Sequence, residues 1–103
     1  MKNTQLRIRV LLALQAALLG MVTKRMHAVL VSWDEVRVNL RVVFDNELVS
    51  EDVELVGEIE TQIISHLPEH SISSVADVVS TGEKTNQKAG EVFVFLRQAG
   101  DYR

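Results

Sequence analysis

One segment of this chain, residues 36–44, alternates between apolar and polar side chains and constrains the fold more than any other feature of the sequence. The apolar positions are Val36, Val38, Leu40 and Val42, and the polar positions between them are Arg37, Asn39 and Arg41. Successive side chains of a strand point to opposite faces of a sheet, so this period of two predicts a strand with one buried and one wet face. Such strands are typical of antiparallel sheets that are covered on one side.

Two segments have the three- and four-residue apolar spacing of helices that bury one face, residues 4–19 and residues 50–67. Gly20 is suited to close the first helix, because glycine accepts the left-handed backbone conformation found just past many helix ends. Ser50 is expected to cap the second helix, and Pro68 to end it. The stripe of the second helix that we expect to be buried consists of Val53, Val56, Ile59, Ile63 and Leu67.

The first helix is apolar around most of its circumference, since Leu11, Leu12 and Leu19 lie outside its narrow stripe. A helix of this kind is normally buried deeply in the core or buried in part by another chain. Two interpretations therefore stay open for residues 4–19, a central core helix and a contact between two copies of the chain.

Basic residues precede the apolar run 10–22, as they do in a signal peptide. Gln15 interrupts this run, and no small-x-small cleavage site follows it, so we expect a core helix and keep a cleaved signal over residues 1–22 as the alternative. The run is too short to span a membrane. The chain has no cysteine, which excludes disulfides and thiolate metal sites and fits a reducing cytoplasm.

Three further segments, residues 26–33, 72–80 and 91–98, are predicted strands, and a polar loop is expected over 81–90. The last five residues are expected to fray. The order of elements is α-β-β-α-β-β, and each pair of consecutive strands can form an antiparallel hairpin. We therefore expect residues 1–103 to form a single α+β domain, a two-layer sandwich in which a four-stranded antiparallel sheet carries two helices on one face.

Charge is strongly segregated along the chain. Residues 1–41 hold seven Lys or Arg residues against two acids, whereas residues 42–83 hold ten acids and no Lys or Arg. The acids expected on one ridge, formed by the second helix and the turn before it, are Asp45, Glu47, Glu51, Asp52, Glu54 and Glu58. A concentrated negative field selects a positively charged partner, and nuclease surfaces are basic because they hold phosphates. A solvated helix face with no partner is the alternative interpretation of the same charges.

No constellation in the sequence indicates catalysis or a metal or other cofactor. His66 and His70 stand four residues apart, but Pro68 between them stops the helix, and no third ligand is suggested by spacing. His27 has no expected nucleophile beside it. Direct binding of nucleic acid is also not expected, because the wet strand face around Arg37 and Arg41 has too few aromatic residues.

Scattered positions between residues 10 and 68 form a further pattern. They are Ala17-Leu18-Leu19-Gly20-x-Val22-Thr23, Ala28-Val29, Trp33, Phe44-Asp45-x-Glu47, Glu51-Asp52-x-Glu54-Leu55 and Glu58. This pattern resembles the small bacterial immunity proteins that are paired with polymorphic toxins of contact-dependent growth inhibition. The resemblance implies a cytoplasmic, non-enzymatic protein that binds and blocks the C-terminal domain of one cognate toxin, often a nuclease. The alternatives are a small homodimeric structural or regulatory protein and a small hydrolase that uses its histidines.

Overall fold

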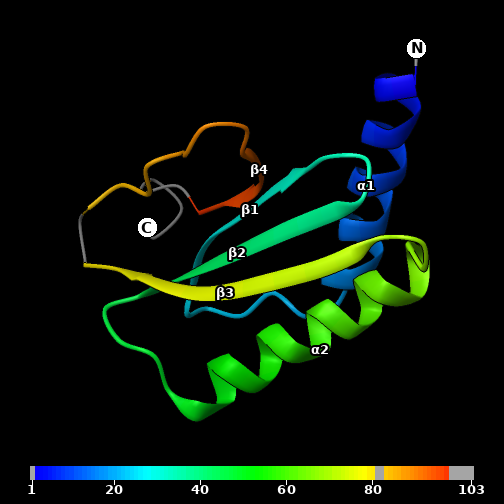
Figure 1. Cartoon of the computed structure of the whole chain (residues 1–103). Coiled ribbons are helices and arrows are strands. Elements are labelled where there is room, and N and C mark those ends of the chain that lie inside the picture. Colours follow the sequence, from blue (N-terminus) through cyan, green and yellow to red (C-terminus); the bar gives the residue numbers. More distant parts are fainter. Residues whose placement is uncertain (1, 81–82, 98–103) are drawn as a thin grey trace.

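The computed structural model describes residues 2–80 and 83–97, which form helices and strands in the order α-β-β-α-β-β, as the sequence predicted (Figure 1). The helices are α1 (Lys2–Leu18) and α2 (Ser50–His66). The strands are β1 (Met26–Trp33), β2 (Arg37–Asp45), β3 (Ser71–Val79) and β4 (Val92–Leu96). The fraying predicted for the last five residues falls outside the described part of the chain, as do the first two residues of the predicted 81–90 loop.

The sheet is mixed, with the strand order β3-β2-β1-β4. β1 pairs antiparallel with β2 and with β4, whereas β3 pairs parallel with β2. The expected four-stranded antiparallel sheet of two adjacent hairpins is therefore wrong, since β3 and β4 lie at opposite edges. The reason is α2, which carries the chain back along the sheet, so that β3 starts beside the start of β2 and runs in the same direction.

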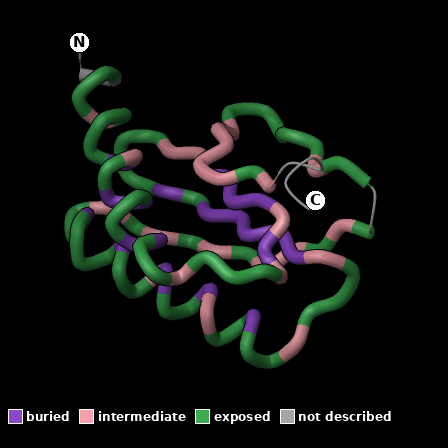
Figure 2. Tube along the Cα trace, turned by 180° about the vertical axis from the view of Figure 1, so that it is seen from behind, coloured by how far each residue is buried: buried purple, intermediate pink, exposed green. Residues whose placement is uncertain are grey.

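The main core lies between one face of the sheet and the two helices. Its largest fully buried side chain is Phe44, and α1 and α2 contribute buried residues such as Leu14 and Ile59. Figure 2 shows the buried positions concentrated in the central strands and on the inner sides of the helices. The prediction that Val53 belongs to the buried stripe is wrong, because it is 54% exposed. Asp52 is the residue that faces inward in the first turn of α2.

The other face of the sheet is not simply wet. A small cluster of Ala28, Leu30 and Val43 is buried there, with Phe93 packed against it. Because β3 and β4 lie at opposite edges, the connection between them must cross the sheet, and Figure 1 shows it on the side away from α2. Arg41, which was predicted to lie on the wet face, is only 9% exposed beneath this connection. A plain two-layer arrangement therefore describes the protein only in part.

Two predicted element ends differ in the structure. Val36, expected to point into the core with Val38, precedes β2 and is exposed in the turn where the Asp34 carboxylate accepts hydrogen bonds from backbone N–H groups. Ser50 is the first residue of α2 and does not cap it, because Val49 occupies the cap position. Gly20 has the expected left-handed backbone, with a φ of 78°. In the described part of the chain, neither helix is long and apolar enough to cross a membrane.

Candidate functional site

The acidic ridge predicted from the sequence is formed by the first turns of α2 and by the segment between β2 and α2. Four of its six residues are exposed, and they are Glu47, Glu51, Glu54 and Glu58. Among the described residues, no Lys, Arg or His forms an ion pair with any of these four. Glu51, Glu54 and Glu58 share the outer side of α2 because its inner side is taken by the core residues Val56 and Ile59. We call these four residues the acidic face.

Asp52 belongs to the same ridge in sequence but is only 3% exposed. Its carboxylate accepts hydrogen bonds from the Arg25 Nε, at 3.0 and 3.2 Å, and from the backbone N–H of Val49 at 3.1 Å. Arg25 also donates to the carbonyl of Glu47. Asp52 thus satisfies a backbone donor at the start of α2 and ties this helix to the segment before β1.

Asp45, at the end of β2, is also paired within the protein. Its carboxylate is bound by the guanidinium of Arg97, and its second oxygen lies 3.3 Å from the Nδ1 of His27. Arg97 also donates to the carbonyl of Lys24. The ridge predicted as one surface is therefore divided: Asp45 and Asp52 hold elements together, and the acidic face points to solvent.

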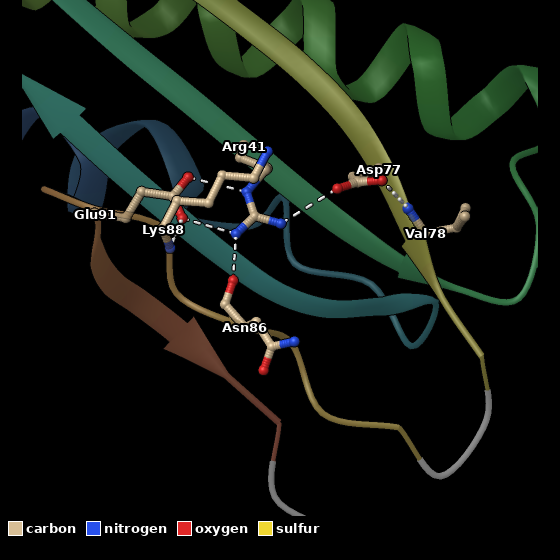
Figure 3. Close-up of polar contacts among 6 residues, drawn as sticks. All are labelled: Arg41, Asp77, Val78, Asn86, Lys88 and Glu91. Carbon is tan, nitrogen blue, oxygen red and sulfur yellow. Dashed lines mark hydrogen bonds and ion pairs between the residues drawn. The ribbon is translucent and has the colours of Figure 1, made fainter.

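Arg41 lies at the centre of a polar cluster with three partners (Figure 3). It donates to the Glu91 carboxylate from Nε at 2.9 Å and from a terminal nitrogen at 2.7 Å. It also donates to Asp77 at 3.2 Å and to the carbonyl of Asn86 at 2.8 Å. These bonds attach the connection before β4 to the centre of the sheet. This role could not be predicted from the sequence, because the three partners lie 36 to 50 residues away from Arg41.

The hydrogen bonds from Arg41 are the main cause that lowers the pKa of Glu91, and the backbone N–H of Lys88 adds to this effect. In return, hydrogen bonding to Glu91 raises the pKa of Arg41. Arg41 and Glu91 are thus both charged at neutral pH. Arg41 is not available as a nucleic-acid contact on a wet strand face, although Arg37 on the same strand is exposed.

The three histidines lie on different elements. His66 ends α2, where its Nδ1 lies 2.9 Å from the carbonyl of Gln62, and His70 lies in the turn beyond Pro68. Within the described ranges, no three His, Asp or Glu side chains gather so that they could hold a metal ion. The contact of His27 with Asp45 orients an imidazole as in some hydrolases, but no described hydroxyl group forms a hydrogen bond with His27.

The chain matches the sequence model of the MafI2 immunity protein over residues 7–99. This range includes α2, all four strands and most of α1, together with the acidic face and the residues that pair Asp45 and Asp52. A comparison with curated proteins found no match. The match confirms the prediction of a small bacterial immunity protein, which rested on scattered positions in the first two thirds of the sequence. Because it extends over nearly the whole length, the chain belongs to the MafI2 immunity protein family.

Proposed function

We propose that this immunity protein neutralises its cognate toxin by binding a basic surface of the toxin domain with the acidic face. Membership of the family implies a cognate toxin partner. The observation that carries the proposal is the exposure of Glu47, Glu51, Glu54 and Glu58 without a cationic partner among the described residues. The inhibition needs binding alone and no catalysis by the immunity protein.

The distribution of ion pairs supports this surface over other acidic positions. Four of the ten acids in residues 42–83 are paired with arginines, and they are Asp45, Asp52, Glu69 and Asp77. These ion pairs neutralise four acids of the segment, and the acids without an arginine partner include all four residues of the acidic face. Neighbouring like charges on a helix repel each other by about 0.2–0.5 kcal/mol per pair. A positive partner would convert this repulsion into attraction, and a concentrated field speeds its encounter.

A nuclease domain is the partner class that fits this surface best, because a surface that holds nucleic-acid phosphates is basic. We infer a C-terminal toxin domain, as in contact-dependent growth inhibition, that is met in the cytoplasm. The bonds of Asp52 to Arg25 and Val49 support a preformed binding surface, since they fix the start of α2 before any partner arrives. Preformed surfaces lose less conformational freedom on binding. Asp45 and Asp52 would lie beside the contact and support it.

The proposal is tested with the double variant Glu54→Lys/Glu58→Lys. Association with the purified cognate toxin domain, followed by stopped-flow fluorescence, is expected to slow by roughly tenfold or more at low salt. The difference should shrink at high salt, because exposed charges are screened over a Debye length of about 3 Å at 1 M ionic strength. Protection of cells that express the toxin should fall in parallel.

The matched control is Glu35→Lys/Glu83→Lys, which makes the same change in net charge at exposed positions outside α2. It should slow association much less. Equal slowing by both variants would show a general effect of net charge, and no change in the α2 variant would show that the acidic face is solvated surface. Melting temperatures of the two variants check that each is folded.

A further inference from the structure

β3 forms one edge of the sheet, and β2 is its only hydrogen-bonded neighbouring strand in the part of the chain that the structure describes (Figure 1). The odd-numbered residues of β3 bond to β2, so the backbone N–H and C=O groups of Ile72, Ser74 and Ala76 point outward. The outward N–H of Val78 is already bonded to the carboxylate of Asp77. A row of outward backbone groups of this kind is a template for a further strand.

This edge lacks the features that normally prevent the addition of a strand. Protein sheets protect their edges with bulges, prolines, lysines or very short edge strands. β3 contains no proline and no lysine, and its register with β2 runs without a shift. The opposite edge strand, β4, has only five residues, and its pairing with β1 shifts in register between Val29 and Leu30. Of the two described edges, the one at β3 is the better suited to accept a strand.

One flank of α2 lies along this edge and is open. Val53, Gly57, Glu60 and Ile64 follow one another at steps of four, three and four residues, so they share one side of the helix. This side faces β3, because the carboxylate of Glu60 accepts a hydrogen bond from the hydroxyl of Ser74. Val53 is 54% exposed and Ile64 45%, and a Cβ added at Gly57 would meet no atom of the described residues within 4 Å. The side chains of a strand beside β3 would therefore find room against this flank.

We propose that the outward edge of β3 and this flank of α2 bind one extended segment of the toxin domain, which joins the sheet as an added strand. The inference rests on the proposed function, since it names a second part of the same toxin contact. Glu54, a residue of the acidic face, stands three residues before Gly57, so the two surfaces adjoin along α2. The backbone groups of β3 would supply affinity, and the flank would select alternate side chains of the segment.

Charge favours a basic segment as the occupant. Residues 42–83, which include α2 and β3, hold ten acids and no Lys or Arg. Glu60 forms no ion pair within the described ranges, so its carboxylate is placed to meet a Lys or Arg of the docked segment. A second copy of the chain is disfavoured. In an antiparallel pair of two β3 edges centred on Val75, each Ser74 would lie opposite Ala76 of the second copy, which brings two Glu60 carboxylates close together.

Hydrogen exchange of the isotope-labelled protein, alone and saturated with the purified cognate toxin domain, tests the added strand directly. In the complex, the amides of Ser74 and Ala76 should exchange more slowly by at least about tenfold. The amides of Ser73 and Val75 are already bonded to β2, so they are the internal reference and should change less. A contact through side chains alone would leave the rates of Ser74 and Ala76 in their former proportion to this reference.

The variant Ala76→Pro should weaken toxin binding. Proline removes the outward donor at this position and none of the bonds to β2, and edge strands tolerate proline, so folding should survive. The dissociation constant measured by titration calorimetry is expected to rise by about tenfold or more. Ala76→Ser keeps the backbone donor, is the matched control and should bind like the unchanged protein. Melting temperatures of both variants check that each is folded.

Gly57→Gln tests the flank of α2 without a risk to folding, because glutamine favours a helix more than glycine does. Its side chain would occupy the space that the docked segment needs. The substitution should therefore raise the melting temperature of the free protein and at the same time raise the dissociation constant by about tenfold or more.

The outcomes separate this inference from the proposed function. Normal binding by Ala76→Pro and Gly57→Gln, with unchanged relative exchange at Ser74 and Ala76, would overturn the added strand. Slow association of the acidic-face variant Glu54→Lys/Glu58→Lys would in that case still support the acidic face. Normal association of that variant, with Ser74 and Ala76 protected, would support the edge of β3 and contradict the acidic face. Protection of the same two amides in the free protein at rising concentration would assign the edge to a second copy and overturn the proposal.

Discussion

At the scale of single residues, Arg41 shows that a residue's place in a regular strand pattern need not predict whether its side chain is exposed. It stands in a strand with regular alternation and was expected to face water. The chain crosses above it, and its guanidinium is held by two carboxylates and one carbonyl. Neutralisation and hydrogen bonding offset the cost of burying this charge, and removing one partner of such a group leaves the others unsatisfied.

Replacing Arg41 by methionine should therefore destabilise the protein. The Glu91 side chain, only 11% exposed, would lose its counter-ion, and we expect a loss of about 2–4 kcal/mol in the free energy of unfolding. Urea denaturation measures this loss. Arg37→Met, on the same strand but exposed, is the control and should change stability by no more than about 0.5 kcal/mol. Equal effects of the two substitutions would mean that other contacts hold the connection before β4.

The same cluster predicts a dependence of stability on pH. The pKa of Glu91 in the folded protein lies below its ordinary value of 4.5. Folding is therefore stabilised by Glu91 above pH 4.5, and this contribution is lost as the pH falls from there through the folded-state pKa. Glu91→Gln should lower stability at pH 7 and weaken the decline between pH 4.5 and more acidic values. A decline as steep as that of the unchanged protein would assign the acid sensitivity to other carboxyl groups.

At the scale of elements, the neighbours of β3 and β4 were predicted wrongly, and β3 also differs in direction. Its register with β2 runs from Ser71 beside Arg37 to Val79 beside Asp45. The N–H of Ser71 donates to Val36, and the carbonyl of Val79 accepts from Asn46. In a parallel pair, alternate residues of a strand direct both their N–H and their C=O group to the neighbouring strand. In β3 these are the odd-numbered residues, which bond to β2, whereas the backbone N–H and C=O groups of the even-numbered residues point away from the sheet. The carboxylate of Asp77 accepts the outward N–H of Val78.

Hydrogen exchange followed by NMR should resolve this pattern. The amides of Ser73, Val75 and Asp77 should exchange slowly, because β2 accepts their hydrogen bonds. Those of Ser74 and Ala76, which point away from the sheet, should exchange faster by at least about tenfold. Uniform protection along β3 would indicate that another strand covers this edge, and the opposite alternation would contradict the parallel register.

At the scale of the whole molecule, folding changes the charge pattern that the sequence displays. Arg9, Arg25, Arg41 and Arg97 each pair with an acid that is 27 to 60 residues away. Among the described residues, Glu47, Glu51, Glu54 and Glu58 have no cationic partner and together form the acidic face. The acidic face is the surface proposed for the toxin.

The order and approximate extent of the elements could be predicted from the sequence, because apolar periodicity and terminal residues such as Gly20 and Pro68 act within a few neighbouring positions. For the same reason it placed Glu51, Glu54 and Glu58 on an outer helix face. It also carried the scattered pattern of an immunity protein, which the match over residues 7–99 confirms.

The direction of β3, the burial of Arg41 and the division of the acidic ridge depend on contacts between distant parts of the chain, so the sequence did not predict them. Alternation along a strand reports which face is buried but not which strand lies beside it or in which direction it runs. Likewise, Asp45, Asp52 and Glu54 are all acids in one sequence segment, and the sequence does not show which of them will meet an arginine. Folding brings Arg97 to Asp45, 52 residues away, and Arg25 to Asp52, 27 residues away. The charge of Glu54 remains exposed because no described cation reaches it.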